Sequence, residues 1–421
     1  MLHAIPVRQF GAFGDPMAEA VSRCVHCGFC LAACPTYREL GQEMDSPRGR
    51  IVLMKSVLEG AMPWTAAQPH VERCLGCLAC EPACPSGVPY RDLISPFRAL
   101  AASRVRRPWG ERFRRYVVAQ TLPHPRRFRW AVRLGTWARR LWLPVPGPLQ
   151  PMTDLLPAAL PPAQSWPERV QAVPPRRARV ALLAGCAQQV LAPDILSATV
   201  AVLTRNGVEV RVPSGQGCCG GLSWHTGDQD AARHFARVNL AAFPSDVDAI
   251  LTTAAGCGSA LHEYPLMLRG TDDEGRAREL AGRVEDVSVF LARLGLRTPL
   301  RTPRLRVAYH DACHLVHAQG VRQAPRNLLR SISGVELVEL SDPEFCCGSA
   351  GSYNLDQPEL ASSLGRRKAQ AVVDSGADLV VSGNIGCLNQ LEVHLKALGR
   401  AVPVRHTVQV IRDSMTGNGA S

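Results

Sequence analysis

The sequence predicts a multidomain protein in which a cysteine-rich N-terminal domain precedes two similar α/β domains with parallel sheets. The chain has 421 residues, too many for one hydrophobic core, and its hydrophobic content of 46% is that of a folded protein. Eight of the 16 cysteines lie between residues 24 and 84. The other eight recur in an internal repeat that occupies the second half of the chain.

The predicted first domain, residues 1–100, contains two copies of one cysteine motif. CVHCGFCLAACP (24–35) and CLGCLACEPACP (74–85) both have the pattern C-x2-C-x2-C-x3-C-P. Two-residue gaps let a tight turn aim three thiolates at one [4Fe-4S] cubane, whereas the fourth cysteine lies a helical turn further on and binds the other cluster. The proline after each fourth cysteine then interrupts the local structure.

The spacing therefore predicts two [4Fe-4S] clusters that exchange their fourth ligands. We expect the first cluster to be bound by Cys24, Cys27, Cys30 and Cys84, and the second by Cys74, Cys77, Cys80 and Cys34. The alternative is a pair of structural zinc sites. Zinc sites take four ligands in two pairs, however, and this leaves the additional cysteine and proline of each copy without a role. His26 lies inside the first motif and is expected near the cluster, not as a ligand.

The next predicted segment, residues 101–178, begins with basic and aromatic residues. Residues 101–150 contain 12 Arg, no Lys and a single acidic residue, Glu111, so they hold +11 of the net charge of +12. Within them an apolar stripe recurs at helical spacing and consists of Trp130, Leu134, Trp137 and Leu141. A Pro-rich stretch over 144–175 then predicts an ordered linker.

The basic helix has two interpretations. It lies either on an anionic membrane surface or on a partner subunit, or else it packs on its own domain with its arginines exposed. Nucleic acid is not an expected partner, because no recognition module accompanies the charge.

Residues 179–300 and 301–421 are predicted to be two copies of one α/β unit. The matching segments are RVALLAGC (179–186) with RVAYHDAC (306–313), GQGCCGG (215–221) with PEFCCGSAG (343–351), and VDAILTTAAGCGSAL (247–261) with ADLVVSGNIGCLNQL (377–391). Matching cysteines are separated by 127, 128 and 130 residues, so the alignment barely drifts. Strands that alternate with helices predict parallel sheets, and the duplication predicts an approximate two-fold axis.

Each repeat places four cysteines after strands or in a Cys-Cys-Gly loop. Because loops after the carboxyl ends of parallel strands gather at one edge, we expect each quartet to converge. The quartets are Cys186, Cys218, Cys219 and Cys257 in the first repeat, and Cys313, Cys346, Cys347 and Cys387 in the second. Four thiolates suit a further iron–sulfur cluster or a zinc ion. The alternatives are reduced cysteines buried at an interface, or a vicinal disulfide.

Several polar residues accompany these quartets. His310, Asp311, His314 and His317 surround Cys313, and His225 follows Cys219 in the sequence. They either ligate or tune a metal, or they are ordinary hydrogen-bonding residues at the ends of strands.

The sequence lacks motifs for other chemistry. It contains no G-x-G-x-x-G after a strand, no G-x-x-x-x-G-K-[ST], and no paired-carboxylate or nucleophile motif. Substrate oxidation is therefore expected on another polypeptide. We read no secretory signal and no stretch of ~18 apolar residues, and 16 cysteines suit a compartment that keeps thiols reduced. We expect a cytoplasmic protein, soluble or peripheral on a membrane.

The whole pattern resembles the iron–sulfur subunit family of bacterial glycolate oxidase (glycolate dehydrogenase). Besides the two cubane motifs, the resemblance rests on CPTYRELGQEMDSPRGRIVLMKSVLEG (34–60), CPSGVPYRDL (84–93), GCAQ (185–188), CCGSAGSYNL (346–355) and NIGC (384–387). It implies an α-helical ferredoxin-type N-terminal domain followed by two Cys-Cys-Gly domains. It also implies flavin-bearing partner subunits, with FAD on those subunits only, that oxidise glycolate to glyoxylate and also act on D-lactate. Electrons would pass toward membrane quinone at the cytoplasmic face of the inner membrane.

Two rival functions come from the Cys-Cys-Gly repeats. They look like those of heterodisulfide reductase and of the anaerobic glycerol-3-phosphate and lactate-utilisation iron–sulfur subunits, so one rival is a thiol or disulfide reductase, and the other is an iron–sulfur subunit for those substrates. The heterodisulfide reductase pattern ends each repeat in C-x-x-C, but here the last positions are Ala260 and Gln390. This departure argues against five-cysteine clusters. A third interpretation is a non-catalytic scaffold, in which the repeats bind partner proteins and only the cubanes conduct electrons.

Overall fold

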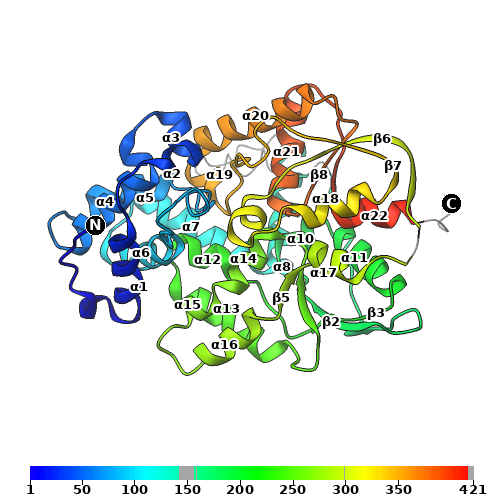
Figure 1. Cartoon of the computed structure of the whole chain (residues 1–421), viewed down its shortest axis with the longest axis horizontal. Coiled ribbons are helices and arrows are strands. Elements are labelled where there is room, and N and C mark those ends of the chain that lie inside the picture. Colours follow the sequence, from blue (N-terminus) through cyan, green and yellow to red (C-terminus); the bar gives the residue numbers. More distant parts are fainter. Residues whose placement is uncertain (142–155, 158, 298, 416–421) are drawn as a thin grey trace.

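The computed structural model describes residues 1–141, 156, 157, 159–297 and 299–415. The predicted Pro-rich linker thus lies partly outside the described residues. Figure 1 shows the N-terminal helices at one end of the molecule and the two α/β units at the other. None of the helices in the described residues combines the length and the apolar character that crossing a membrane requires.

The N-terminal part is helical, as predicted. Both cysteine motifs begin where a helix ends, since Cys24 follows α1 and Cys74 follows α5. Prolines occupy the first position of α3 and α4, where their missing N–H costs nothing. The elements are η1 (Val7–Phe13), α1 (Gly14–Arg23), α2 (Phe29–Ala33), α3 (Pro35–Leu40), η2 (Glu43–Asp45), α4 (Pro47–Leu58), α5 (Trp64–Arg73) and α6 (Arg91–Arg104).

Two basic helices follow, α7 (Trp109–Thr121) and α8 (Pro125–Arg140). The predicted apolar stripe on α8 faces outward: Trp130 is 62% exposed and Trp137 is 58% exposed. Instead, α8 buries Val132 against the body of the protein. Within the described residues, α8 thus packs on the protein through a face other than the apolar stripe, and the stripe itself is exposed.

The first α/β unit has a sheet of five strands in the order β1-β3-β2-β4-β5, in which only β1 pairs antiparallel. Its elements are β1 (Arg169–Val170), β2 (Ala178–Leu182), α10 (Ala187–Leu191), α11 (Asp194–Arg205), β3 (Val208–Arg211), α12 (Gly221–Thr226), α13 (Gln229–Ala242), β4 (Ala249–Thr252), α14 (Ala255–His262), α15 (Tyr264–Met267), α16 (Glu274–Ala281), β5 (Val284–Asp286) and α17 (Val287–Leu294).

The second unit repeats this arrangement with four parallel strands in the order β7-β6-β8-β9. Both units therefore carry a fourth parallel strand, β5 or β9, that the sequence analysis did not anticipate. The elements are β6 (Arg301–Tyr309), the π-turn η4 (His314–Ala318), α18 (Gln323–Arg330), β7 (Ser333–Val338), α19 (Tyr353–Asp356), α20 (Pro358–Asp374), β8 (Leu379–Ser382), α21 (Ile385–Ala397), β9 (Val404–His406) and α22 (Thr407–Ser414).

The two units meet where their third strands end. The backbone N–H of Ala255 donates to the carbonyl oxygen of Gly383 at 3.0 Å, and these residues follow β4 and β8, the equivalent strands of the two units. The His406 ring lies 2.8 Å from the carbonyl oxygen of Thr253. The amide of Gln409 donates to Asp194 at 2.7 Å. Equivalent strand ends thus face one another, as an approximate two-fold axis requires.

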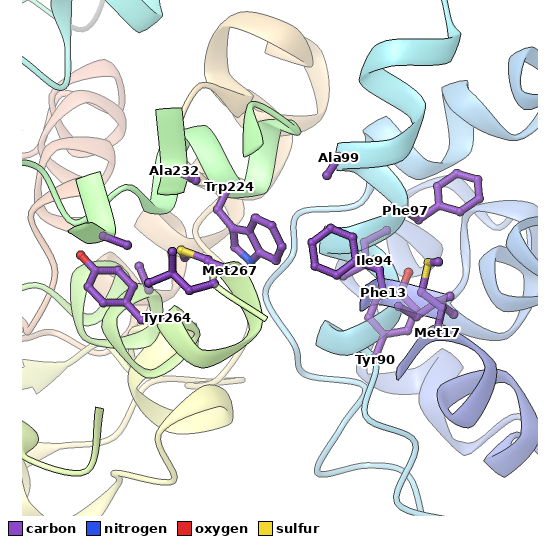
Figure 2. Close-up of a cluster of buried hydrophobic side chains, with 14 of the residues drawn as sticks. Phe13, Met17, Tyr90, Ile94, Phe97, Ala99, Trp224, Ala232, Tyr264 and Met267 are labelled. Carbon is purple, nitrogen blue, oxygen red and sulfur yellow. The ribbon is translucent and has the colours of Figure 1, made fainter. Parts of the chain in front are cut away.

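The N-terminal helices share a core with the first unit. Figure 2 shows Phe13 and Phe97 on the helical side facing Trp224 and Met267 of the first unit. The rings of Phe13 and Trp224 are 5.9 Å apart, and the Trp224 indole donates to Glu263 at 2.7 Å. Such an aromatic pair contributes ~1 kcal/mol beyond its buried area. The cysteine-rich domain is therefore held against the repeats by a continuous core.

Candidate metal centres

The first cysteine motif surrounds a small cavity at the surface of the N-terminal domain. Its sulfur lining consists of Cys24, Cys27, Cys30, Cys84 and Cys80. Cys27 is exposed, as are the neighbouring side chains of Val25 (64%) and Phe29 (67%). Burial raises the pKa of Cys30 to about 11, with further contributions from Cys24 and Cys84. Thiols this close ionise together only when a cation or a metal compensates their charge.

The second motif surrounds a deeper cavity. Its sulfur lining consists of Cys34, Cys74, Cys77 and Cys80. The two cavities thus divide the cysteines into the two quartets named above, and Cys80 and Tyr90 line both. Cys84 lies with the first motif and Cys34 with the second. Which of these sulfurs bind iron stays a prediction.

Left-handed backbone turns aim the sulfurs of both motifs. His26 and Gly28 have φ values of +58° and +85°, and the equivalent Gly76 and Leu78 have +64° and +60°. Left-handed conformations suit glycine but cost free energy at His26 and Leu78. The same strained path in both copies indicates that the loop shape serves the sulfurs and does not merely connect two helices.

Positive charge and hydrogen bonds surround the second cavity. Arg50 is 1% exposed, pairs with the buried Asp45 at 3.4 Å, and has Nη1 3.8 Å from Sγ of Cys34. The Tyr90 hydroxyl donates to Sγ of Cys74 at 3.8 Å, and the Gly76 N–H lies 3.4 Å from the same sulfur. Burial tends to raise the pKa of Cys74, but the nearby guanidinium of Arg50 and that of Arg98 outweigh it and lower the pKa. The cavity therefore favours the thiolate form at Cys74, the form that ligates metal, whereas burial raises the pKa of Cys77 and of Cys80 well above the ordinary value.

The Cys-Cys-Gly quartets converge in both repeats. In the first, Sγ of Cys218 lies 3.5 Å from Sγ of Cys186, and Cys219 hydrogen-bonds both Cys218 and Cys257. In the second, hydrogen bonds run from Cys313 to Cys346, Cys347 and Cys387 in turn. All 16 cysteines are free, so the vicinal disulfide is not formed. Whether these quartets hold iron–sulfur clusters or zinc stays a prediction.

The quartets differ in their electrostatics. Hydrogen bonds from Cys218 and Cys257 lower the pKa of Cys219 well below its ordinary value. At the equivalent position of the second repeat, the hydrogen bond with Cys346 lowers the pKa of Cys347, but the hydrogen bond with Cys387 and burial outweigh it and raise that pKa well above its ordinary value. The two copies of the unit have therefore diverged at the same position in the fold.

Ala260 and Gln390 occupy the positions of the missing fifth cysteines. Ala260 is buried, and the amide of Gln390 donates to the Ala361 carbonyl oxygen at 3.0 Å and accepts from Asn354 at 3.1 Å. The Gln390 side chain is thus committed to other contacts. Neither position offers a fifth thiolate.

A large cavity lies beside the shared core, and residues of both the cysteine-rich domain and the repeats line it. Its volume is about 740 Å³, and apolar side chains from α6, α7 and α8 form much of its wall. Four sulfur-bearing residues from three of the quartets line it: Cys74, Cys219, Cys257 and Cys313. His225 and His314 stand between them with ring centroids 5.5 Å apart. Burial lowers the pKa of each histidine to about 4, so both are neutral at pH 7.

Comparison with known proteins identifies two kinds of domain in the chain. Residues 20–88 match a 4Fe-4S dicluster domain, and residues 180–262 and 307–392 match a cysteine-rich domain. The chain is 37% identical to the glycolate oxidase iron–sulfur subunit of Escherichia coli (strain K12), in a match that covers 94% of this chain and 95% of that protein. The chain belongs to the family of glycolate oxidase iron–sulfur subunits. Both the resemblance inferred from the sequence and the predicted fold class are confirmed.

Other members and relatives of the family show the same relationship. The chain is 36% identical to the probable glycolate oxidase iron–sulfur subunit of Bacillus subtilis (strain 168), with 93% of each chain covered. It is 31% identical to lactate utilization protein A of Oceanobacillus iheyensis, over 57% of this chain and 98% of that protein. The family is therefore defined over nearly the whole chain, and the lactate protein matches a part of it.

The polar residues that the sequence places around the cysteines of the repeats lie in different surroundings in this iron–sulfur subunit. Asp311 forms a buried bidentate pair with Arg326 at 2.7 and 2.8 Å, and the His314 ring lies 2.9 Å from the carbonyl oxygen of Gly76. His317 lies 3.9 Å from Glu344. His310 alone among this set lies with two cysteines, Cys347 and Cys387.

Sequence reasoning missed Arg50, Tyr90 and the large cavity. Arg50 lies in helix α4 together with Arg48 and Lys55, so the sequence pattern does not distinguish the buried arginine from these other basic residues. Tyr90 follows a short loop after the second motif and carries no pattern. The cavity is formed by helices far apart in the chain, so no local sequence pattern predicts it.

Proposed function

We propose that this chain is the electron-transfer subunit of a glycolate-oxidising complex and that it holds two [4Fe-4S] clusters in the two small cavities. The observation that carries the proposal is the division of the eight N-terminal cysteines into two adjacent quartets, with Cys80 and Tyr90 in both linings. The similarity over 94% of the chain to a glycolate oxidase iron–sulfur subunit supports the choice of complex. A bound [4Fe-4S] cluster supplies one-electron transfer at a potential set by its surroundings.

The residues of this chain position and insulate the two clusters. The left-handed turns around Gly28 and Gly76 aim the sulfurs inward. Arg50 and Tyr90 hold positive charge and a hydrogen bond next to the deeper quartet. The exposed rim at Val25, Cys27 and Phe29 leaves the first quartet accessible to a partner protein. An apolar exposed rim of this kind suits docking of a flavin-bearing subunit.

Glycolate oxidation itself is assigned to flavin-bearing partner subunits. The sequence contains no flavin-binding motif, and the site described here contains cysteines and hydrogen-bond donors but no acid–base pair poised for a hydroxy acid. Glycolate is preferred over lactate because the glycolate oxidase relatives match nearly the whole chain, whereas the lactate relative matches 57% of it. D-lactate is the second substrate to test.

The acceptor is assigned to the membrane quinone pool, with the chain bound peripherally at the cytoplasmic face. The exposed Trp130, Leu134 and Trp137 on the arginine-rich helix α8 support contact with an anionic membrane surface. The same helix forms a wall of the large cavity, whose apolar lining suits an apolar ligand such as a quinone ring.

Reconstitution tests this function. The chain alone should not oxidise glycolate, and turnover should appear when the flavoprotein subunits are added. In the complex, Cys77→Ser should slow acceptor reduction more than flavin reduction, so that flavin reduction in the same sample serves as the internal control. Glycolate turnover by the purified chain without flavoprotein, or equal slowing of both half-reactions, would refute the proposal.

A further inference from the structure

A buried imidazole in the second repeat lies with two thiols at a point that electron transfer through the N-terminal domain does not use. The ligand atoms of His310, Cys347 and Cys387 all lie within 4.8 Å of one another. His310 comes from the end of β6, Cys347 from the Cys-Cys-Gly loop, and Cys387 from the first turn of α21. All three side chains are buried, at 1% exposure each.

His310 has no hydrogen-bond partner for either ring nitrogen within the described part of the chain. An unpartnered polar group in a protein interior costs ~1–3 kcal/mol, so native structures seldom leave one without a purpose. A neutral imidazole has a free lone pair, the form in which histidine ligates a metal.

We propose that the second repeat binds one zinc ion through His310, Cys347 and Cys387, with Cys346 as the fourth ligand. Thiolate sulfur together with imidazole nitrogen is the ligand set that zinc takes in structural sites. Zn–N and Zn–S bonds of about 2.1 and 2.3 Å place tetrahedral ligands about 3.5–3.8 Å apart, so the present side chains need to move by about 1 Å. Cys346 is chosen as the fourth ligand because it is adjacent to Cys347 in the chain and its thiol hydrogen-bonds that of Cys347.

The surroundings complete the site electrostatically. Three thiolates and one neutral imidazole around Zn²⁺ carry a net charge of −1, and the buried ammonium of Lys368 faces Cys347 and Cys346. Lys368 is anchored by the carbonyl oxygen of Asp342 at 2.6 Å. The amide of Asn384 donates to Sγ of Cys387 at 3.3 Å, and the Gly348 N–H lies 3.5 Å from Sγ of Cys346. Such contacts orient ligands and stabilise thiolate.

The first repeat does not reproduce this site. The residue three positions before Cys186 is Leu183, at the place where His310 precedes Cys313. Leu183 is 2% exposed and packs in the core shared with the N-terminal helices. The duplication therefore supplies a matched substitution: His310→Leu gives the second repeat the side chain that the same fold already accommodates in the first.

A zinc ion here fixes three segments and carries no electrons, because Zn²⁺ has no redox chemistry at biological potentials. The site clamps the end of β6, the Cys-Cys-Gly loop and the start of α21. It is independent of the function proposed above, which depends on the N-terminal cysteines. Zinc content and cubane iron are counted separately, so either proposal can fail without the other.

Metal analysis of the full-length chain, produced anaerobically with iron and zinc supplied, tests the site. The wild-type chain should contain about one zinc in addition to its cubane iron. His310→Leu should lose that zinc to a chromophoric chelator at least ten-fold faster than wild type, with its iron unchanged. His317→Leu, which replaces another buried histidine of the same segment, should retain zinc as wild type does. Equal zinc retention in His310→Leu and wild type would overturn the proposal.

X-ray absorption at the zinc edge of the wild-type chain gives a second readout that needs no variant. The expected first shell contains one nitrogen and three sulfurs. An all-sulfur shell would remove His310 from the site even where His310→Leu fails to fold. Absence of zinc, with iron above the content of two cubanes, would replace the zinc ion by an iron–sulfur cluster and also overturn the proposal.

Discussion

Nη1 of Arg50 lies 3.8 Å from Sγ of Cys34, and both side chains are buried. A guanidinium in the protein interior next to a cluster ligand favours the more negative, reduced state of that cluster. Arg50 is held there by Asp45 at 3.4 Å and donates to Thr36 at 3.0 Å. The charge is therefore fixed in place.

Removal of this charge should lower the reduction potential of the deeper cluster. Arg50→Met deletes an interaction of about 1.5 kcal/mol or more, which corresponds to ~60 mV for one electron. Potentiometric titration followed by electron paramagnetic resonance measures the shift. Arg50→Lys retains the charge and should recover most of the potential, and the cluster of the first cavity serves as an internal reference. A potential equal to wild type in Arg50→Met would contradict this assignment.

Single cysteine substitutions should distinguish the two cavities. Cys84→Ser should perturb the cluster of the first motif, and Cys34→Ser that of the second, because each lies in the cavity formed by the opposite motif. Each variant should fall from about eight iron and eight sulfide per chain toward about four. Spectra of the two variants should differ. If Cys34→Ser instead removed the signal that depends on Cys24, the exchanged arrangement would be wrong.

Helix α8 should bind anionic vesicles through its exposed arginines. Arg126, Arg133 and Arg140 are exposed, whereas Arg129 and Arg139 donate to backbone carbonyl oxygens of residues 156–161 and are kept intact. The triple Gln variant should lose ~1 kcal/mol per charge, about 100-fold in all, and the loss should shrink at high salt. Co-sedimentation with phosphatidylserine-containing vesicles measures it.

The control variant also removes three positive charges, but from the two repeats and not from α8. Arg276, Arg278 and Arg304 are exposed on the two repeats, and their replacement by Gln should leave vesicle binding unchanged. If both triple variants bind as wild type, α8 is not the membrane contact.

His406 should make stability fall in mild acid. Burial lowers its pKa from 6.5 to about 4, and its ring lies 2.8 Å from the Thr253 carbonyl oxygen across the junction of the two repeats. The unfolded chain binds a proton below pH 6.5 that the folded chain does not bind until about pH 4. The contribution of His406 to the free energy of unfolding is thus fully present above pH 6.5. It decreases as the pH falls toward 4, by at most ~3 kcal/mol.

Denaturant unfolding at pH 7 and pH 5 measures this dependence. The His406 side chain also accepts from Val408 N–H as the cap of α22, so His406→Asn preserves a capping acceptor and removes the titration. The free energy of unfolding of His406→Asn should change less between the two pH values than that of wild type. An identical change would assign the acid sensitivity to other groups.

The repeat and both cysteine motifs were predictable because their signals are local. Nearly constant offsets between matching cysteines indicate the equivalence of β2 with β6, and two-residue gaps indicate the turns around each motif. The strands β5 and β9 were missed because three residues are too few for a periodic pattern. Their pairing partners β4 and β8 lie elsewhere in the chain.

The orientation of α8 shows a second limit of sequence patterns. The spacing of Trp130 and Trp137 predicts one apolar face, but periodicity does not say whether that face is covered. The structure buries Val132 and leaves the tryptophans exposed. Likewise, the approach of His310 to Cys387 depends on the parallel pairing of β6 with β8, which brings together residues far apart in the chain.

Cys27 lies at the surface and Cys77 in the interior, so oxygen should oxidise the ligands of the two clusters one after the other. Oxidation of cysteine ligands follows their exposure. Cys27 is exposed, whereas Cys77 is 8% exposed and belongs to the same buried cluster as Phe345 and Tyr353. A preparation stored aerobically will therefore first become a half-loaded protein that keeps its inner cluster. Iron contents measured on aged samples will underestimate the native complement, and the shortfall will report the age of the sample.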